Sequence, residues 1–553
     1  MKNLASKNRE RLFWNIVSFV CFLYFGFFFL YPMFKMLIGS LFTSEGFSLA
    51  PFIKFFSTKY YMTAVWNSLK VGTLVTAITL VTGTLFALIM RTVSIKGKKL
   101  IDTLLLVSTI TPPFLGAYAW IVLFGRVGPV TVFFNNLFNV TLDGLYGLGG
   151  IVFVFVIHST PLMYMYISGA LKNVDNSLNE AAENLGCIGI RRLFKVTLPL
   201  ILPTILSSLL LIFMGAISDF GTAKLIGEGY NTMATLIYSS FVGEVSRDTS
   251  MASAMSVITL AFTTLIFILQ RWLATRRSVE MSAMHPIVPK KAHGLKKILS
   301  YFYVYFMTFL AILPILTISY NSIQKCTGQL FVAGYSLDSY RKVFANMGTA
   351  FTNTYVYGII ALAIILVIGI AESYANVRHT SWLTKAMDTT TIFPFIVPGS
   401  VLGISMILAF NGKPFMLNGT AIIVISAWVI RRLPYTVRSS TSILHQINYN
   451  VEEASQSLGA NGLHTFTKVT LPMMFTGVLP GALLSWVSAI TELSCTVLIY
   501  SSRTITMSIA IYSEVAKGNY GTASAMSTIL LFSAIIVLCI LFKLSNGKWD
   551  FSL

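Results

Sequence analysis

One segment of this chain occurs twice, with the same residues in the same order. Each copy has a Glu-Ala-small triplet, then a glycine after three residues, then a Val-Thr-Leu-Pro run after nine more. The copies are Glu180-Ala181-Ala182, Gly186 and Val196-Thr197-Leu198-Pro199, and Glu453-Ala454-Ser455, Gly459 and Val469-Thr470-Leu471-Pro472, displaced by 273 positions. Both polar segments lie between strongly apolar stretches. This arrangement predicts a chain of two related halves, each presenting the same loop to a two-fold partner.

The composition excludes an ordinary soluble fold. Of the 553 residues, 55% are hydrophobic and 11% are charged, whereas about a quarter are charged in soluble domains. A membrane span needs about 20 mostly apolar residues, and it has to be helical because lipid offers no partner to backbone polar groups. Two sets of six spans are predicted, near 12–39, 64–90, 100–124, 148–171, 197–222 and 251–273, and near 298–322, 350–376, 387–410, 419–440, 470–498 and 521–543.

The duplication extends beyond the polar loops. Asn67 and Asn353 open the second spans and are 286 positions apart, as are Pro112 and Pro398 in the third spans. Six spans per half give the halves the same orientation, which is a known transporter plan. We therefore predict an all-α integral membrane protein of about 12 helices in two parallel repeats. Its domains are residues 1–273, a basic linker 274–297, and residues 298–553.

The net charge of +20 is best explained by membrane orientation. Lys and Arg gather in the short loops that face the cytoplasm if both termini are inside, as the positive-inside rule requires. A nucleic-acid partner is therefore not needed to explain the charge, and none is expected. The basic N-terminus leads into a long apolar run without a cleavage site, which predicts an uncleaved first span. The five cysteines have no CxxC spacing, so neither a metal site nor a disulfide framework is indicated.

The repeated loops have the pattern of a short helix ended by glycine. Glu180 and Glu453 lie near a helix start, where the helix dipole favours a carboxylate. Gly186 and Gly459 can end the helix in a left-handed conformation. A second short helix is predicted over 188–195 or 461–468, followed by a turn into the next span. Such a unit can fit a groove on another protein.

This pattern resembles the hallmark of permease subunits of type I ABC importers, and the resemblance covers nearly the whole chain. It implies the type I ABC importer permease fold and loops that dock on two ABC ATPase subunits. The residues that match the motif are Glu180, Ala181, Ala182, Gly186, Glu453, Ala454, Ser455 and Gly459, with a departure at Ser455, where the motif has alanine. No G-x-x-x-x-G-K-[ST] segment is present, so we expect no enzyme activity or cofactor here, with ATP and Mg bound by the partner ATPase. One fused chain per complex in the bacterial cytoplasmic (inner) membrane is expected.

Five polar residues inside or beside the spans are candidates for the translocation path. An ionisable residue at mid-span costs roughly 2.5–3.5 kcal/mol on insertion scales. His158 and Arg431 are repeat mates, with Arg432 beside Arg431, and they form a polar patch able to attract an anion, unless the arginines snorkel to an interface. Asp219 and Glu492 are also mates. They form an outer gate, contact a substrate-delivery protein, or are ordinary boundary carboxylates.

The segments Ser218-Asp219-Phe220-Gly221 and Thr491-Glu492-Leu493-Ser494 resemble those of fused permeases of the ferric-iron uptake family. That resemblance implies ferric iron delivered by an extracytoplasmic solute-binding protein. The alternatives are a phosphonate, another organophosphate or thiamine. Arginines suit the oxyanions of a phosphonate and equally the anion that accompanies iron. Outside this class, an ion-coupled secondary transporter would leave the repeated loops unexplained, and a membrane enzyme lacks any visible catalytic constellation.

Overall fold

The computed structural model describes residues 2–43, 46–139, 141, 143–243, 249–275, 285, 288–328 and 330–544. These residues are helical apart from short loops and two small antiparallel hairpins. One hairpin pairs β1 (Phe42–Thr43) with β2 (Gly46–Phe47), and the other pairs β3 (Gln324–Thr327) with β4 (Leu330–Tyr335). The predicted all-α class is confirmed.

The helices of the first half are α1 (Lys2–Phe25), η1 (Gly26–Leu30), α2 (Tyr31–Leu41), α3 (Ala50–Ser57), α4 (Lys59–Thr92), α5 (Lys98–Ile110), α6 (Pro113–Phe124), α7 (Pro129–Phe138), α8 (Gly147–Lys172), α9 (Asn176–Asn184), α10 (Gly189–Arg192), η2 (Leu193–Thr197), α11 (Leu198–Ser218), α12 (Gly221–Ile226), α13 (Met233–Val242) and α14 (Thr249–Thr275).

The helices of the second half are α15 (Gly294–Ile323), α16 (Asp338–Asn346), α17 (Gly348–Arg378), α18 (Trp382–Ile392), η3 (Phe393–Phe395), α19 (Gly399–Phe410), α20 (Ala421–Gln446), α21 (Asn450–Ser457), α22 (Gly462–Thr465), η4 (Phe466–Thr470), α23 (Leu471–Ile490), α24 (Thr496–Ile499), α25 (Met507–Ala516) and α26 (Tyr520–Leu544). Residues 276–284 and 286–287 of the predicted linker lie outside the described residues.

Nine helices in the described ranges are long and apolar enough to cross a membrane, or eleven if each of two bent pairs counts as one span. The predicted count of 12 is therefore not confirmed. α20 lies where the tenth span was predicted, but it is not among these helices because it carries Arg431, Arg432 and Arg438. The polar character of this one span is a first indication that it lines something other than lipid.

The third and ninth predicted spans are broken. The helical backbone stops at Thr111 and Pro112, which are extended, and restarts as α6. In the second half α18 and α19 are bent by 114° around the segment that contains Pro398. Proline explains both breaks because it lacks a backbone donor and disfavours the helical conformation of the residue before it.

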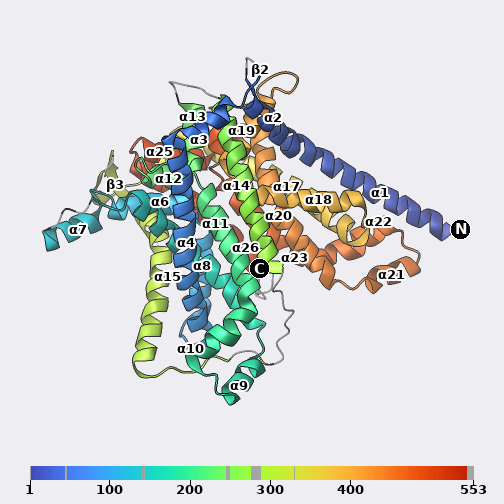
Figure 1. Ribbon diagram of the computed structural model, residues 1–553, viewed down its shortest axis with the longest axis horizontal. Helices are drawn as coiled ribbons and strands as arrows, with labels where there is room; N and C mark the ends of the chain where they lie inside the picture. The colour runs from blue at the N-terminus through green and yellow to red at the C-terminus, as the bar shows by residue number, and fades with distance from the viewer. Residues whose placement is uncertain are drawn as a thin grey trace.

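Each half has a three-helix bundle, and the first span of each half leaves its own bundle. α4 packs on α8 and α11, and α17 packs likewise on α20 and α23. The first span of the chain packs on α14 of its own half and also on the second half, α2 on α19 and α1 on α17 and α18. α15 packs on α26 of its own half and also on α5 and α6 of the first half. Figure 1 shows α1 reaching away from its own half and α15 running beside α4. The two halves are thus interlocked.

The halves share a buried core at the end of the molecule opposite the repeated loops. Tyr118 of α6 is fully buried, and its hydroxyl contacts the carbonyl oxygen of Tyr520 and the hydroxyl of Ser524 of α26, each at 2.7 Å. Phe220 packs on Tyr512 across the same junction, with the ring centroids 5.8 Å apart and the rings tilted by 55°. At the other end, α9 and α21 lie well apart (Figure 1). The junction therefore holds the halves together on one side and leaves the loops separate.

Candidate functional site

The two repeated loops begin with the same capping contact. The side chain of Asp175 accepts a hydrogen bond from the backbone N–H of Ser177 at 2.9 Å, at the start of α9. Asn448, 273 positions later, accepts one from Asn450 N–H at 3.0 Å, at the start of α21. A side-chain oxygen at this position satisfies a backbone donor that the helix itself leaves unpaired.

The loops also end in the same way. Gly186 and Gly459 have φ of 76° and 91°, the left-handed conformation predicted from the sequence, which glycine adopts without steric cost. Cys187 N–H donates to the carbonyl of Ala182 at 2.8 Å, and the second copy has the same i to i−5 bond from Ala460 to Ser455 at 3.2 Å. This is the Schellman arrangement, and it fixes the shape of both loops.

The turn predicted after the second short helix is absent. α10 continues through the π-helical turn η2 into α11, and α22 continues through η4 into α23. The N–H of Leu198 bonds to the carbonyl of Leu193, five residues back. The wider turn precedes Pro199, which has no N–H to offer and would crowd a regular helical turn. Each loop is therefore joined to its following span by a continuous helix.

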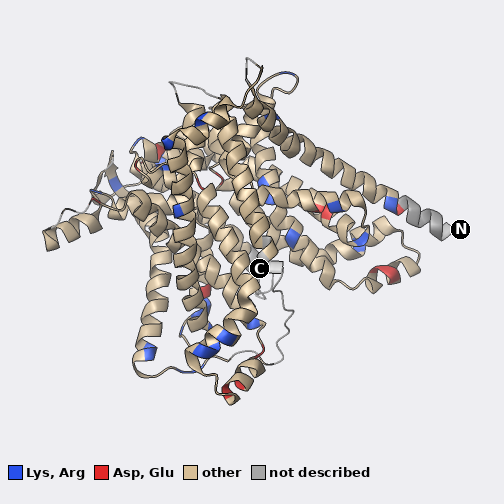
Figure 2. Ribbon diagram, viewed as in Figure 1, with Lys and Arg blue, Asp and Glu red and all other residues tan. Residues whose placement is uncertain are grey.

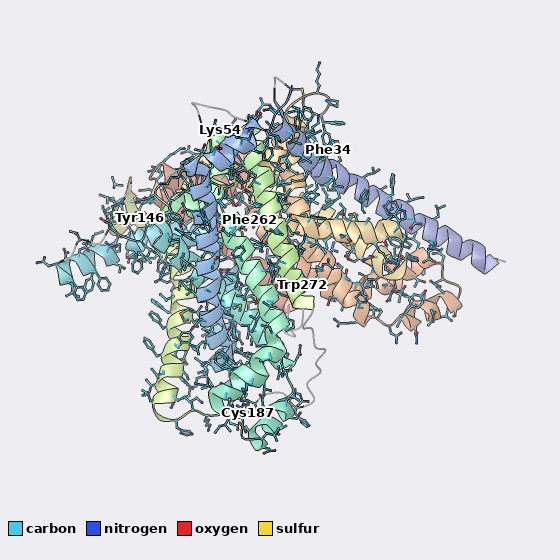
Figure 3. The ribbon with its side chains drawn as sticks, viewed as in Figure 1. Phe34, Lys54, Tyr146, Cys187, Phe262 and Trp272 are labelled. Atoms are coloured by element: carbon cyan, nitrogen blue, oxygen red, sulfur yellow. The ribbon has the colours of Figure 1, made fainter. Side chains whose placement is uncertain are left out.

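The loop surfaces combine a carboxylate with an exposed leucine. Glu180 and Glu453 are exposed, and Leu185 and Leu458 are 87% and 91% exposed. Figure 3 places Cys187 of the first loop at the end of the molecule opposite Lys54. The two leucines were missed from the sequence, although their shared spacing of 273 was a usable signal. An exposed apolar side chain beside a charge is typical of a protein contact surface.

Of the other motif residues, Ala181 and Ala454 are exposed, Ala182 is buried and Ser455 is half-buried. The hydroxyl of Ser455 lies 3.0 Å from that of Thr465 in α22. The departure from alanine at Ser455 thus adds a hydrogen bond inside the loop and leaves its exposed surface unchanged.

The loops differ in how they are attached to the bundles. Glu452 of α21 is 1% exposed, and its carboxylate accepts from Arg378 Nε at 2.9 Å and from the Tyr374 hydroxyl at 3.0 Å, both on α17. Its mate in the first loop is Asn179, whose side-chain oxygen accepts from the Thr197 hydroxyl at 3.2 Å. The second loop is therefore fixed to its bundle by a buried ion pair, whereas the first has a neutral local contact.

The N-terminal helix also braces the second loop. Trp14 is 3% exposed and its ring lies 4.6 Å from Tyr374 and 5.0 Å from Phe466, centroid to centroid. The Glu10 carboxylate covers Gly462 and lies 3.6 Å from His379 Nε2. Burial lowers the pKa of His379, which keeps the imidazole neutral at pH 7. Residues of the first half thus hold the loop of the second.

Two of the five predicted path residues form an ion pair inside the second half. Arg431 Nη1 lies 3.2 Å from Glu492 Oε1, with side chains 15% and 2% exposed. Glu492 also accepts from the N–H groups of Cys495 and Thr496, at 3.0 and 2.9 Å. Snorkelling of Arg431 to an interface is therefore excluded, since its charge is neutralised within the protein. The Nε of Arg432 is buried and has no hydrogen-bond partner among the described residues.

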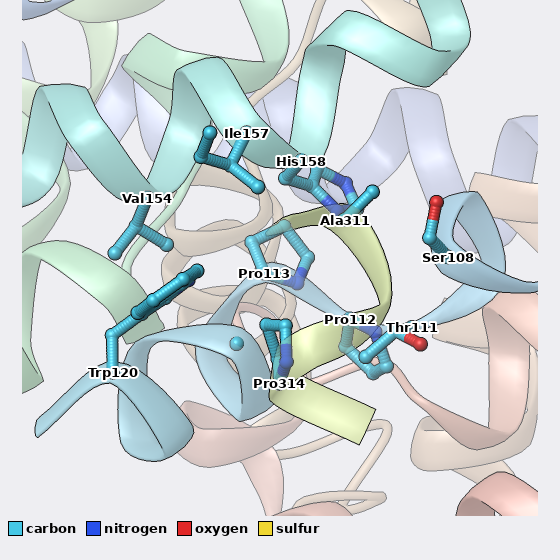
Figure 4. Close-up of a pocket in the computed structure, with 11 residues that line it drawn as sticks. Ser108, Thr111, Pro112, Pro113, Trp120, Val154, Ile157, His158, Ala311 and Pro314 are labelled. Atoms are coloured by element: carbon cyan, nitrogen blue, oxygen red, sulfur yellow. The ribbon is translucent and has the colours of Figure 1, made fainter. Parts of the chain in front are cut away.

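The corresponding residues of the first half are not brought together. Asp219 accepts from Thr222 N–H at 2.7 Å, at the start of α12, as Glu492 does at the start of α24. His158 lines a cavity of about 20 Å³ between α5, α6, α8 and α15, enough for about one water molecule. Figure 4 shows its ring beside Pro113 and Ala311. Both carboxylates thus cap a short helix, and among the described residues an ion pair with arginine is recorded only for Glu492.

Two further repeat pairs have structural roles. The side-chain amides of Asn67 and Asn353 donate to the carbonyls of Asn231 and Ile505, each at 3.0 Å, before α13 and α25. Asp102 and Asp388, 286 positions apart and missed from the sequence, contact Tyr164 and Arg438. These contacts join the third span to the fourth in each half. No group of three or more metal-ligating side chains occurs in the part of the chain that the structure describes.

The fold defines a two-repeat membrane transport subunit in which each half carries an exposed loop of the same shape. The chain belongs to the family described as "binding-protein-dependent transport system inner membrane component", which matches residues 79–279 and 365–549. It is the permease subunit of an ABC importer, a multi-pass membrane protein that works with a binding protein.

Several curated relatives cover most of the chain. The ferric transport system permease protein FbpB of Actinobacillus pleuropneumoniae is 28% identical over 91% of this chain and 74% of its own length. The Fe(3+)-transport system permease protein FbpB 2 of Haemophilus influenzae is 26% identical over 82% and 85%. The 2-aminoethylphosphonate transport system permease protein PhnU of Salmonella typhi is 28% identical over 42% and 81%.

Among solved structures, a bacterial ABC transporter involved in the import of the acidic polysaccharide alginate is 16% identical, with a TM-score of 0.42. It covers 50% of this chain and 100% of its own.

Proposed function

We propose that this permease imports ferric iron handed over by an extracytoplasmic binding protein. The observation that carries the proposal is the similarity to ferric transport permeases over about nine tenths of the chain, far beyond the 42% matched by the phosphonate permease. Iron enters here as cargo, and no group of three or more metal-ligating side chains occurs among the described residues.

Two ABC ATPase subunits are proposed to dock on the loops of α9 and α21, binding the ATP and Mg themselves. On this proposal both termini and both loops face the cytoplasm of a bacterium, in its inner membrane, with one fused chain per complex. Glu180, Leu185 and Gly186, with their mates Glu453, Leu458 and Gly459, form the contact. Because each loop continues as a helix into α11 or α23, closure of the ATPases moves the spans directly.

The buried arginines are proposed to act on the anion that travels with the iron. Arg431 pairs with Glu492, and the buried Nη1 of Arg431 and Nε of Arg432 each lack a hydrogen-bond partner among the described residues. An unpaired guanidinium donor inside the protein favours an oxyanion. His158 and Asp219 occupy the mate positions on the first-half side of the path.

The test is ATP-dependent uptake of radiolabelled ferric iron into vesicles that contain the chain, its ATPase and its binding protein. Saturable uptake is expected, and Glu180→Arg with Glu453→Arg should abolish it because both loops would repel their docking site. The double variant Asn184→Arg with Ser457→Arg, also exposed on the same helices, is the matched control and should retain uptake. ATP turnover without iron movement would reject iron as the cargo.

The second candidate cargo is a phosphonate, supported by the PhnU similarity and by the same Arg432. Uptake of radiolabelled 2-aminoethylphosphonate in these vesicles separates the two. A phosphonate signal that iron does not compete away would favour this alternative.

A further inference from the structure

A basic segment of the first half and the basic end of the predicted linker are joined at one end of α15. Lys290 N–H donates to the Thr92 carbonyl at 2.9 Å, and Ser94 N–H donates to the Lys290 carbonyl at 3.0 Å. The hydroxyl of Tyr301 donates to the Ser94 carbonyl at 2.9 Å, and that of Tyr305 to the Lys96 carbonyl at 3.1 Å. Residues 91–99 and 288–297 therefore form one surface, which we call the basic ledge.

The ledge concentrates positive charge, and the acidic residue that follows its first segment, Asp102, interacts with Lys98 and Arg91. Six of its lysines are exposed: Lys96, Lys99, Lys290, Lys291, Lys296 and Lys297. No Asp or Glu occurs in residues 91–101 or 288–323. Figure 2 shows basic residues at the lower end of α15. Because like charges repel, a cluster of this kind is stabilised by an anionic partner.

Exposed apolar side chains surround and continue the ledge. Leu100 is 63% exposed beside Lys99, and Leu295 and Ile298 are 70% and 65% exposed beside the lysines of α15. The same face of α15 continues with Phe302, Phe309 and other exposed residues up to Tyr320. α15 has 30 residues, about 45 Å at 1.5 Å per residue, so it exceeds a hydrocarbon core of about 30 Å. The apolar face places the lysines at the level of the lipid headgroups.

We propose that the basic ledge binds the headgroups of anionic phospholipids in the cytoplasmic leaflet, with acyl chains along α15. The choice of leaflet rests on the orientation given under Proposed function, whereas the binding itself does not. The ledge belongs to the lipid-facing edge of the first half, and α15 has no substantial contact with α9 or α10 among the described elements. At the corresponding positions of the second half, Trp382 and Thr384 replace Lys96 and Lys98, whereas Lys385 matches Lys99.

The experiment is native mass spectrometry of the full chain in detergent, titrated with phosphatidylglycerol. The ledge variant changes Lys96, Lys290, Lys296 and Lys297 to Gln, and the matched control changes the exposed Lys59, Lys325, Lys342 and Lys413 to Gln. Each removes four charges. The ledge variant should bind phosphatidylglycerol about tenfold more weakly, while the control binds it like the wild type.

Further measurements identify the ligand and control for misfolding of the variants. Changing the four ledge lysines to Arg should preserve binding, which shows that the charge and not the fold was removed. Phosphatidylcholine should bind the ledge variant and the wild type equally. Equal affinity of both glutamine variants for phosphatidylglycerol would overturn the proposal, and so would its displacement by millimolar inorganic phosphate. None of these readouts depends on iron transport, so failure of the proposed cargo leaves the result interpretable.

Discussion

Two residues of the second half illustrate how repeat mates diverge. Arg431 and Glu492 form a buried ion pair, but their mates His158 and Asp219 remain separate in the first half. The pair is possible because Gly399 leaves room for the guanidinium: a Cβ at that position would overlap Arg431 Nη1 and lie 2.7 Å from Ser494 Cβ. Pro113 lies at the mate position of Gly399, beside the smaller imidazole of His158. The position of the Arg431 side chain therefore depends on the absence of a side chain at Gly399.

Glu492→Gln is expected to destabilise the protein far more than Asp219→Asn. Glu492→Gln leaves the Arg431 charge buried and unpaired, at a cost of about 3–5 kcal/mol. Asp219→Asn keeps an acceptor for the Thr222 N–H and breaks no ion pair recorded in the described residues. Thermal unfolding in detergent measures both. Equal losses from the two variants would contradict the assignment of the ion pair.

Gly399→Ala should lower stability by about 1–3 kcal/mol, because the added methyl group forces Arg431 out of its position. Gly412→Ala is the control, since its Cβ would meet nothing within 4 Å. Urea or thermal unfolding of both variants gives the comparison. A Gly399→Ala protein as stable as the control would show that Arg431 can relocate without penalty.

The two loops have the same shape but are attached to their helix bundles by different contacts. Their caps and glycine ends coincide contact by contact, as expected if both loops bind the identical ATPase subunits proposed above. Their inner faces differ, because Glu452 is fixed by Arg378 and Tyr374 while Asn179 makes a neutral contact. On that proposal, recognition and attachment depend on different residues of the same short helix.

Neighbouring glutamates of α21 separate these two roles. Glu452→Gln should lower the unfolding temperature, because it removes a buried ion pair and leaves the Arg378 charge uncompensated. Glu453→Gln should leave that temperature unchanged but reduce ATP-driven uptake, since its side chain is exposed and faces the proposed partner. Thermal unfolding and vesicle uptake are measured on both proteins. A stable Glu452→Gln protein would contradict the attachment role.

At the scale of the whole molecule, the halves are interlocked through their first spans. Hydropathy predicted where most spans lie and the repeat predicted their parallel arrangement, because both depend on residues close in sequence. The crossing of α1 and α15 to the opposite halves could not be predicted, since an apolar stretch does not specify its neighbour. Likewise the residues of the loop motif were found from spacing, but the pairing of Arg431 with Glu492 depends on how α20 packs against α23.

A chain split between Glu280 and Met281 should reassemble from its two pieces when both are expressed. Each piece supplies a first span that packs on the other, so co-purification through a tag on one piece is expected. Replacing residues 10–41 by an unrelated span of equal length preserves topology but removes the α2–α19 contact. Recovery of the second piece should then fall several-fold. Undiminished recovery would show that the α1 and α2 contacts do not hold the halves together.

The covalent joining of the halves has an evolutionary consequence. In a homodimer each substitution occurs twice, so a charge that needs a unique partner would also be created on the opposite side. In the fused chain each half always contacts the other half, whose sequence differs from its own. Arg431, Glu492 and Gly399 could therefore evolve together while position 158 remained histidine. The fusion thus allows selection to act on the residues of each half separately. An asymmetric cargo can then be bound by a translocation path whose two sides differ.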